Sequence, residues 1–275
     1  MTAVVTRASR RAPRPRSGRV PWILLVPAVA GVLFLVLPFA GMLLRAPWPA
    51  MGARVTDPDV VAALWLSLST ATAATAVSLL FGVPLAWLLA RTEFPGRRLV
   101  RALVTVPLVI PPVVGGVALL MVLGRNGVIG RYLDAWFGLT LPFTSAAVVI
   151  AQVFVAMPFL VISVEGALRG ADRRYEEAAA TLGASRVTIF ARVTLPMVLP
   201  GIAAGAVLCW ARALGEFGAT ITFAGNFPGT TQTMPLAVYM AMQRDPEAAV
   251  VLSLVLLLVS LAVLATLRER WVRAA

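Results

Sequence analysis

Long apolar segments, separated by shorter stretches that carry most of the charge, dominate this sequence. Six segments contain no charged residue: 22–44, 60–90, 102–124, 135–164, 193–211 and 248–267. Each is long enough for an α-helix to cross about 30 Å of hydrocarbon, which takes roughly 18 to 20 residues. The pattern predicts an all-α membrane protein with six transmembrane helices, the fourth of them confined to the part of its segment that begins near Ser145.

Composition supports the same class. The chain has 275 residues, 60% of them hydrophobic, and a mean hydropathy of +0.89, well above that of soluble globular domains. The third segment is interrupted by Pro107, Pro111, Pro112 and the Gly115–Gly116 pair. We count it as one span and expect bent helices around a cavity, where neighbouring helices satisfy the interrupted backbone.

The formal net charge is +12, and all basic residues are arginines. Eighteen arginines would lie on one side of the membrane: before the first segment, after the last, between the second and third, and between the fourth and fifth. The connections on the other side hold only five. This distribution along a membrane chain excludes a nucleic-acid-binding surface. The positive-inside rule predicts that both termini and the long connection 170–196 are cytoplasmic.

We divide the chain into an Arg/Pro-rich tail (1–20), a first transmembrane helix with its external loop (21–56), and a five-helix core (57–270). The tail is expected near anionic lipid headgroups. The chain has one cysteine, Cys209, and neither histidine nor lysine. Without lysine the chain cannot form a Walker-type nucleotide-binding loop, and without histidine or a group of cysteines it offers few metal ligands. We therefore expect no catalytic residue, no cofactor and no metal site.

The connection 170–196 is long and polar for a membrane protein, and it has the signals of two short helices. Asp172 is a good N-cap, and Gly183 suits a left-handed C-cap. Ser185 can cap a second helix, which Pro196 is expected to end or kink. On the first helix, apolar residues at i, i+4 and i+7 form a ridge. They are Tyr175, Ala179 and Leu182.

This connection resembles the conserved cytoplasmic loop of permease subunits of bacterial ABC importers. The resemblance is carried by Glu177-Ala178-Ala179, Gly183 and Val193-Thr194-Leu195-Pro196, with Val193 where the family usually has isoleucine. It implies the type I ABC importer permease fold and a coupling helix that docks on a separate ATPase. The residues it assigns to coupling are Tyr175, Glu177, Ala178, Ala179, Leu182, Gly183, Leu195 and Pro196. The alternative is an ordinary capped amphipathic helix on the membrane surface.

The resemblance also implies partners. These are two copies of a cytoplasmic ATPase subunit and an extracytoplasmic substrate-binding protein. Six helices enclose too little space for a pathway, so we expect a second copy of the chain about a twofold axis. Membrane lipid surrounds the assembly, and no nucleic acid is expected.

A second segment follows the fifth span. Arg212 and Glu216 lie four residues apart and can pair on one helix face, and charges at this depth are candidates for function. Residues 213–226, from Ala213-Leu214-Gly215-Glu216 to Asn226, resemble molybdate permeases. Sulfate and thiosulfate permeases share the Leu-Gly-Glu-Phe-Gly part. We expect 217–243 to form a structured external loop or partial re-entrant segment.

Hydrogen-bond donors along a pathway suit the passage of a tetrahedral dianion, provided that they do not bind it so tightly that it cannot leave. We therefore assign the pathway or its outer gate to the pair and to neighbouring polar residues of this segment. They are Arg212, Glu216, Thr220, Thr222 and Asn226. The competing interpretation is that Arg212 and Glu216 only stabilise the fold.

Three alternatives remain for function. A sulfate, thiosulfate or tungstate permease would use the same mechanism. An ion-coupled secondary transporter would normally carry intramembrane carboxylates, for which only Glu216 comes close. A membrane-embedded enzyme is disfavoured because no Ser/His/Asp set can be assembled.

Overall fold

The structure is a computed structural model that describes the backbone of residues 22–272, with side chains up to Val263 and at Ala265. The Arg/Pro-rich tail (1–20) and the residues after 272 lie outside this range. The described elements are α1 (Trp22–Arg45), α2 (Trp48–Val55), α3 (Pro58–Arg91), α4 (Arg97–Val109), α5 (Pro112–Leu123), α6 (Gly130–Phe137), α7 (Ser145–Gly170), α8 (Arg174–Thr181), α9 (Arg186–Ile189), the π-helical η1 (Phe190–Thr194), α10 (Leu195–Leu214), α11 (Gly218–Phe223), α12 (Met234–Arg244) and α13 (Pro246–Val272). The chain forms two compact units, divided between Arg45 and Ala46.

The first unit contains α1 alone among the described elements. Its 24 residues are almost all apolar, and none is buried. At 1.5 Å per residue the helix is about 36 Å long, enough to cross a bilayer. Pro27 and Pro38 lie inside it.

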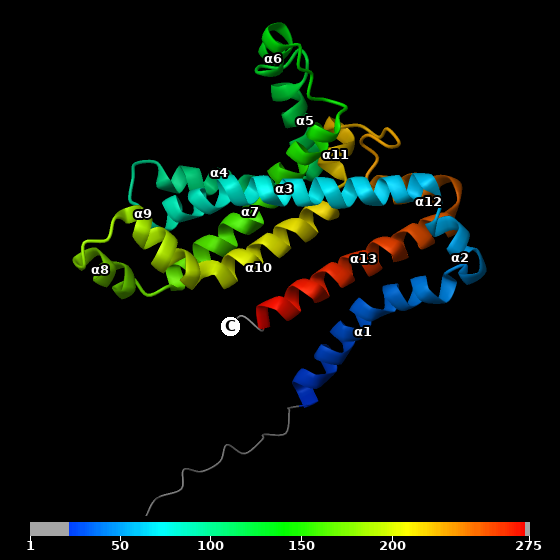
Figure 1. Cartoon of the computed structure of the whole chain (residues 1–275). Coiled ribbons are helices and arrows are strands. Elements are labelled where there is room, and N and C mark those ends of the chain that lie inside the picture. Colours follow the sequence, from blue (N-terminus) through cyan, green and yellow to red (C-terminus); the bar gives the residue numbers. More distant parts are fainter. Residues whose placement is uncertain (1–21, 273–275) are drawn as a thin grey trace, which may run out of the picture. The chain divides into compact units, whose positions relative to one another are not determined.

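The centre of the second unit is the packing of α3, α7 and α10 on one another (Figure 1). The side of α3 that faces this core is lined by small residues, including Ala71 and Ala74, which are fully buried. Leu160, Val161 and Val164 of α7 fill the space opposite. Small residues let membrane helices approach closely and replace a hydrophobic driving force with packing.

The contact between α7 and α10 depends on glycine. A Cβ added at Gly205 would lie 2.9 Å from the Ser163 Cβ, and one added at Gly201 would overlap Ala167. The Ser163 hydroxyl donates a hydrogen bond of 3.1 Å to the carbonyl oxygen of Gly201. The two helices therefore touch along their backbones, and this fixes the direction in which α10 leaves the loop that precedes it.

The described residues contain five helices that are long and apolar enough to cross a membrane. A sixth span exists if α4 and α5 count as one, and these two helices meet at an angle of 119°. The bend that we expected in the third segment is therefore a complete break. Ile110 and Pro111 both adopt extended conformations, because a residue before proline avoids the helical region and proline offers no N–H to continue the ladder.

The fifth span differs from our expectation at its start. Pro196 does not end a helix, because α9, η1 and α10 form one continuous helical segment from Arg186 to Leu214. Pro196 lies in the first turn of α10, directly after the π-helical residues 190–194. A π-turn shifts the hydrogen-bonding register, so the N–H that proline lacks leaves no gap in a regular ladder. The span therefore begins seven residues before Val193.

At the far end of the unit, α2 is tied to the start of α13. Arg54 Nη1 donates to Asp245 Oδ2 at 2.7 Å. Asp245 Oδ1 also accepts the N–H groups of Glu247 and Ala248, both at 3.1 Å. The Ala248 N–H and then the Arg54 guanidinium hold the pKa of Asp245 below its ordinary value.

Candidate functional site: the loop before α10 and the junction after it

The loop between α7 and α10 is built as two capped helices, as the sequence predicts. Asp172 Oδ1 accepts the N–H of Arg174 at 3.0 Å, just ahead of α8, and Ser185 Oγ accepts the N–H of Thr188 at 3.2 Å to cap α9. Between them, Gly183 has a φ of +83°. The N–H groups of Gly183 and Ala184 bond the carbonyls of Ala180 and Ala179, which is the Schellman pattern of helix termination.

An ion pair between a buried arginine and a partly buried glutamate holds α8 against the rest of the unit. Arg91 Nη2, at the end of α3, lies 2.9 Å from Glu176 Oε1 in the first turn of α8. The hydroxyl of Thr194, at the end of η1, donates to the same oxygen at 3.0 Å. The side chain of Arg91 is only 6% exposed. One carboxylate oxygen therefore joins three elements: α3, α8 and the π-helical start of α10.

Glu177, the glutamate of the sequence motif, is not the residue that does this. Its side chain makes no hydrogen bond or ion pair with any residue that the structure describes. It lines a cavity of about 420 Å³ together with Arg173, Arg186 and Phe190. Sequence reasoning did not single out Glu176, Arg91 or Thr194 for this contact. A signal was present in Arg91, which ends the charge-free second span.

The outer side of the loop is apolar and uncovered. Tyr175 is 62% exposed and Leu182 is 88% exposed, with Val187 of α9 at 78%, and Ala179 lies partly buried beside them. Apolar groups gathered on a polar surface mark a site of interaction with another molecule. Leu195 does not belong to this surface because it packs against the core of the unit.

At the opposite end of α10 the predicted ion pair is formed. Arg212 Nη1 lies 2.7 Å from Glu216 Oε2, and the glutamate side chain is 1% exposed. Oε1 of Glu216 accepts the N–H of Ala219 at 2.8 Å, in the first turn of α11. Glu216 thus has two functions at once: it neutralises Arg212 and caps α11.

The segment that follows is held by close backbone contact between α11 and α5. A Cβ added at Gly116 would overlap the Thr222 hydroxyl and would lie 2.7 Å from the carbonyl oxygen of Ala219. The Thr222 hydroxyl already donates to the carbonyl of Gly218 at 2.9 Å. Of the residues assigned to the pathway, Thr222 is therefore engaged within its own helix.

Thr220 and Asn226 are different, since each keeps a buried polar atom that has no hydrogen-bond partner among the residues that the structure describes. These atoms are the Thr220 hydroxyl and Asn226 Oδ1. Gln152 of α7, which packs against α11, is fully buried, and neither its amide nitrogen nor its amide oxygen has a partner among the described residues. Buried polar groups are normally hydrogen-bonded. Sequence reasoning missed Gln152, although a glutamine inside an apolar span was a usable signal.

Among the side chains that the structure describes, up to Val263, no group of three His, Cys, Asp or Glu is placed to hold a metal ion.

Comparison with known proteins decides what kind of molecule carries this loop. Residues 82–274 match the family described as "Binding-protein-dependent transport system inner membrane component". The chain belongs to this family.

Relatives and solved structures agree with this assignment. This chain is 52% identical over 239 residues to the "Molybdenum transport system permease protein ModB" of Mycobacterium tuberculosis, and the match covers 87% of this chain and 90% of that protein. It is 37% identical over 236 residues to the "Sulfate transport system permease protein CysT" of Salmonella typhimurium, covering 84% and 85%. A bacterial ABC transporter involved in the import of alginate shares the fold, with a TM-score of 0.71 at 20% identity and coverage of 92% and 94%. The type I importer permease fold expected from the loop is confirmed.

Proposed function

We propose that this chain is the membrane-spanning permease subunit of an ATP-driven ABC importer and that the anion it translocates is molybdate. The observation that carries the proposal is the 52% identity, over nearly the whole length, to a molybdenum transport permease. The sulfate permease CysT is 37% identical, so sulfate is the second candidate. Thiosulfate and tungstate permeases remain related alternatives.

The ATPase partner docks on the uncovered ridge of α8 and α9. The surface consists of Tyr175, Ala179 and Leu182, extended by Val187, with Ala178 on the same short helix. The Glu176–Arg91 ion pair supports this assignment because it holds an eight-residue helix that would be unstable alone. Leu195 and Pro196 contribute indirectly by starting α10 behind the ridge. Two ATPase subunits would serve two copies of the chain.

Force from the ATPase reaches the membrane through one continuous helical segment. Residues 186–214 number 29, and at 1.5 Å each they extend about 43 Å. The segment carries Val187 of the ridge near its start and contacts α8 through Thr194 and Glu176, and Arg212 lies near its other end. A tilt imposed at the loop therefore moves the Arg212–Glu216 pair and, through the Glu216 cap, also moves α11.

The anion pathway runs past this junction. Arg212, neutralised by Glu216, attracts the dianion without trapping it, and Thr220 and Asn226 offer polar atoms that have no partner within the described part of the chain. We add Gln152 for the same reason. Thr222 is retained as a wall residue whose hydroxyl is held by the Gly218 carbonyl. An extracytoplasmic binding protein delivers the anion to this end.

Orientation follows from charge. The arginine-rich ends, including both termini and the α8–α9 loop, are cytoplasmic, and the chain lies in the inner membrane. Reporter fusions after Arg98 and Arg186 should read as cytoplasmic, and fusions near Asp57, Asp134 and Asn226 as external. An external reading at Arg186 would reverse the proposed orientation.

The subunit itself is not an enzyme, because ATP hydrolysis belongs to the partner. An ion-coupled transporter would import substrate without nucleotide. The proposal is tested by uptake into vesicles that hold the reconstituted complex, with molybdate, tungstate and sulfate in competition. ATP-dependent uptake that excess sulfate leaves intact is expected. Uptake that sulfate abolishes and molybdate does not would assign the chain to sulfate, and uptake without ATP would refute the importer.

A further inference from the structure

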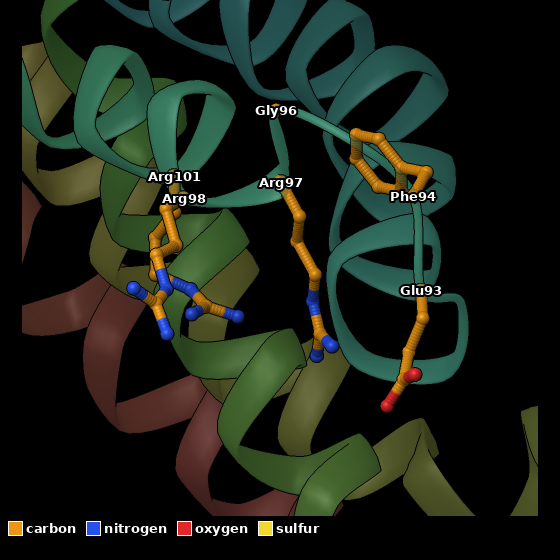
Figure 2. Close-up of a pocket in the computed structure, with 6 residues that line it drawn as sticks. All are labelled: Glu93, Phe94, Gly96, Arg97, Arg98 and Arg101. Carbon is orange, nitrogen blue, oxygen red and sulfur yellow. The ribbon is translucent and has the colours of Figure 1, made fainter.

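The corner between α3 and α4 holds a cavity of about 420 Å³ on the arginine-rich side of the protein. It is lined by Glu93, Phe94, Gly96, Arg97, Arg98 and Arg101. Figure 2 shows the three arginine side chains and Glu93 pointing to the same side of this corner. This cavity shares no lining residue with the cavity next to α8 that Glu177 lines.

Two of these arginines are fixed in place by the protein. The Nε and Nη2 atoms of Arg97 both donate to the carbonyl oxygen of Leu89, at 2.9 and 2.6 Å. Arg101 Nη2 lies 2.7 Å from Glu165 Oε1 and 3.3 Å from the same Leu89 oxygen. These contacts satisfy a carbonyl of the last turn of α3, where positive charge is favourable. The guanidinium groups are thus held in position before anything binds.

Arg98 is different because it is exposed and has no hydrogen-bond or ion-pair partner among the described residues. The carboxylate of Glu165 is shared by Arg101 and Arg169, at 2.7 and 2.6 Å. The corner therefore holds two carboxylates, Glu93 and Glu165, and four arginines: Arg97, Arg98, Arg101 and Arg169. Its formal net charge is about +2. The unused charge is that of Arg98, directed at the cavity.

An apolar stripe leads away from this corner along α4. Leu99, Leu103 and Val106 follow at spacings of four and three residues, and all three are exposed. Such spacing places them on one face of the helix. Because α4 begins the bent span that ends at Leu123, the arginines lie where the span meets water and the stripe lies deeper. A soluble anion would use the arginines but would have no use for the stripe.

We propose that this corner binds one anionic phospholipid of the cytoplasmic leaflet, its phosphate held by Arg98 with Arg97 and Arg101, and its acyl chain lying along Leu99, Leu103 and Val106. Basic pockets at the cytoplasmic ends of transmembrane helices are suited to such headgroups. Glu93 at the mouth of the cavity opposes the phosphate and limits its affinity. The proposal does not depend on which anion the permease transports.

The test uses the complete importer, permease with its ATPase, in nanodiscs of phosphatidylglycerol and phosphatidylethanolamine in equal amounts. The retained lipids are counted by native mass spectrometry. We expect phosphatidylglycerol to be enriched on the wild-type complex. Arg98→Gln should lower this enrichment about fivefold, which corresponds to about 1 kcal/mol for one basic residue at an anionic surface. Glu93→Gln should raise it.

The control is Arg244→Gln, which makes the same charge change at the end of α12, where the arginine is exposed. It should leave the lipid count unchanged. Equal phosphatidylglycerol on wild type and Arg98→Gln would overturn the proposal. So would an equal loss of both lipids, which would mean that headgroup charge is not recognised. Displacement of the lipid by millimolar inorganic phosphate would also overturn it, in favour of a site for a soluble anion.

Discussion

Replacing Glu176 by alanine should release α8 from the body of the permease. The change removes the carboxylate that pairs with Arg91 at 2.9 Å and accepts the Thr194 hydroxyl at 3.0 Å. Removing one partner of a buried ion pair costs about 3–5 kcal/mol. A cavity adjoins Arg91, and water there can solvate the freed guanidinium. We therefore expect a smaller cost, about 2 kcal/mol.

That loss acts on a helix with little stability of its own. An eight-residue helix is marginal in water, so its docked state depends on this contact. About 2 kcal/mol corresponds to a roughly 30-fold change in the ratio of docked to undocked α8. The amide groups of residues 178–184 should exchange with deuterium about that much faster in the purified permease, while those of α7 and α10 stay protected.

Glu177→Ala is the matched control. It removes the same charge from the same first turn of α8, and so it loses the same dipole interaction, about 0.3–1 kcal/mol. It removes no contact that the structure describes. Equal exchange rates in the two variants would refute the role assigned to Glu176. A double variant, Glu176→Ala with Arg91→Gln, should lose less than the sum of the single changes, because each single change leaves a partner unpaired.

Four further predictions concern separate parts of the molecule. Gly183→Val should abolish uptake while the permease still inserts, because φ is +83° there and a β-branched residue is strained by about 1–2 kcal/mol; Gly183→Asn should be tolerated, and wild-type uptake in the valine variant would contradict this. Gly116→Ala should cost about 1–3 kcal/mol in thermal unfolding by driving α5 from α11, whereas Gly166→Ala, where the added Cβ meets nothing within 4 Å, should not. Glu216→Gln should lower uptake per assembled complex by freeing the charge of Arg212, and a fall in assembled complex alone would favour a structural role. Asp245→Asn should lower the melting temperature slightly at pH 7; because the folded pKa of Asp245 is depressed, its stabilisation is present above the unfolded value of about 3.9 and is lost as pH falls from there through the lower folded value, so the difference from wild type should shrink as the pH is lowered through this window.

The sequence was informative wherever a feature depends on neighbouring residues. Charge-free segments predicted the spans because a helix in lipid needs only length and apolar side chains. Gly183 and Ser185 predicted their caps because capping is decided within one turn. The pair of Arg212 and Glu216 was predictable for the same reason, although α10 ends between them at Leu214.

Features that depend on distant residues were not predictable in this way. Adjacent glutamates offered equal candidates for anchoring α8, and the choice of Glu176 is made by Arg91, which lies 85 residues away. The consecutive prolines Pro111 and Pro112 predicted an interruption between α4 and α5, but they did not predict the angle of 119° between the two helices. That angle depends on where α5 packs, and α5 packs on α11 through Gly116, more than a hundred residues before Thr222.

The π-helical turn between α9 and α10 joins these local and distant effects. Had a regular α-helix run through residues 190–194, the ring of Pro196 would have crowded the carbonyl of Arg192, and that carbonyl would have lacked an N–H partner. The π-turn shifts the register at that point, so the helix continues and places the Thr194 hydroxyl 3.0 Å from Glu176. π-turns are rare, and those found inside α-helices are frequently at functional sites. The turn lies where the proposed ATPase contact meets the helix that ends at Arg212, and it is therefore the element best placed to change register when the loop moves.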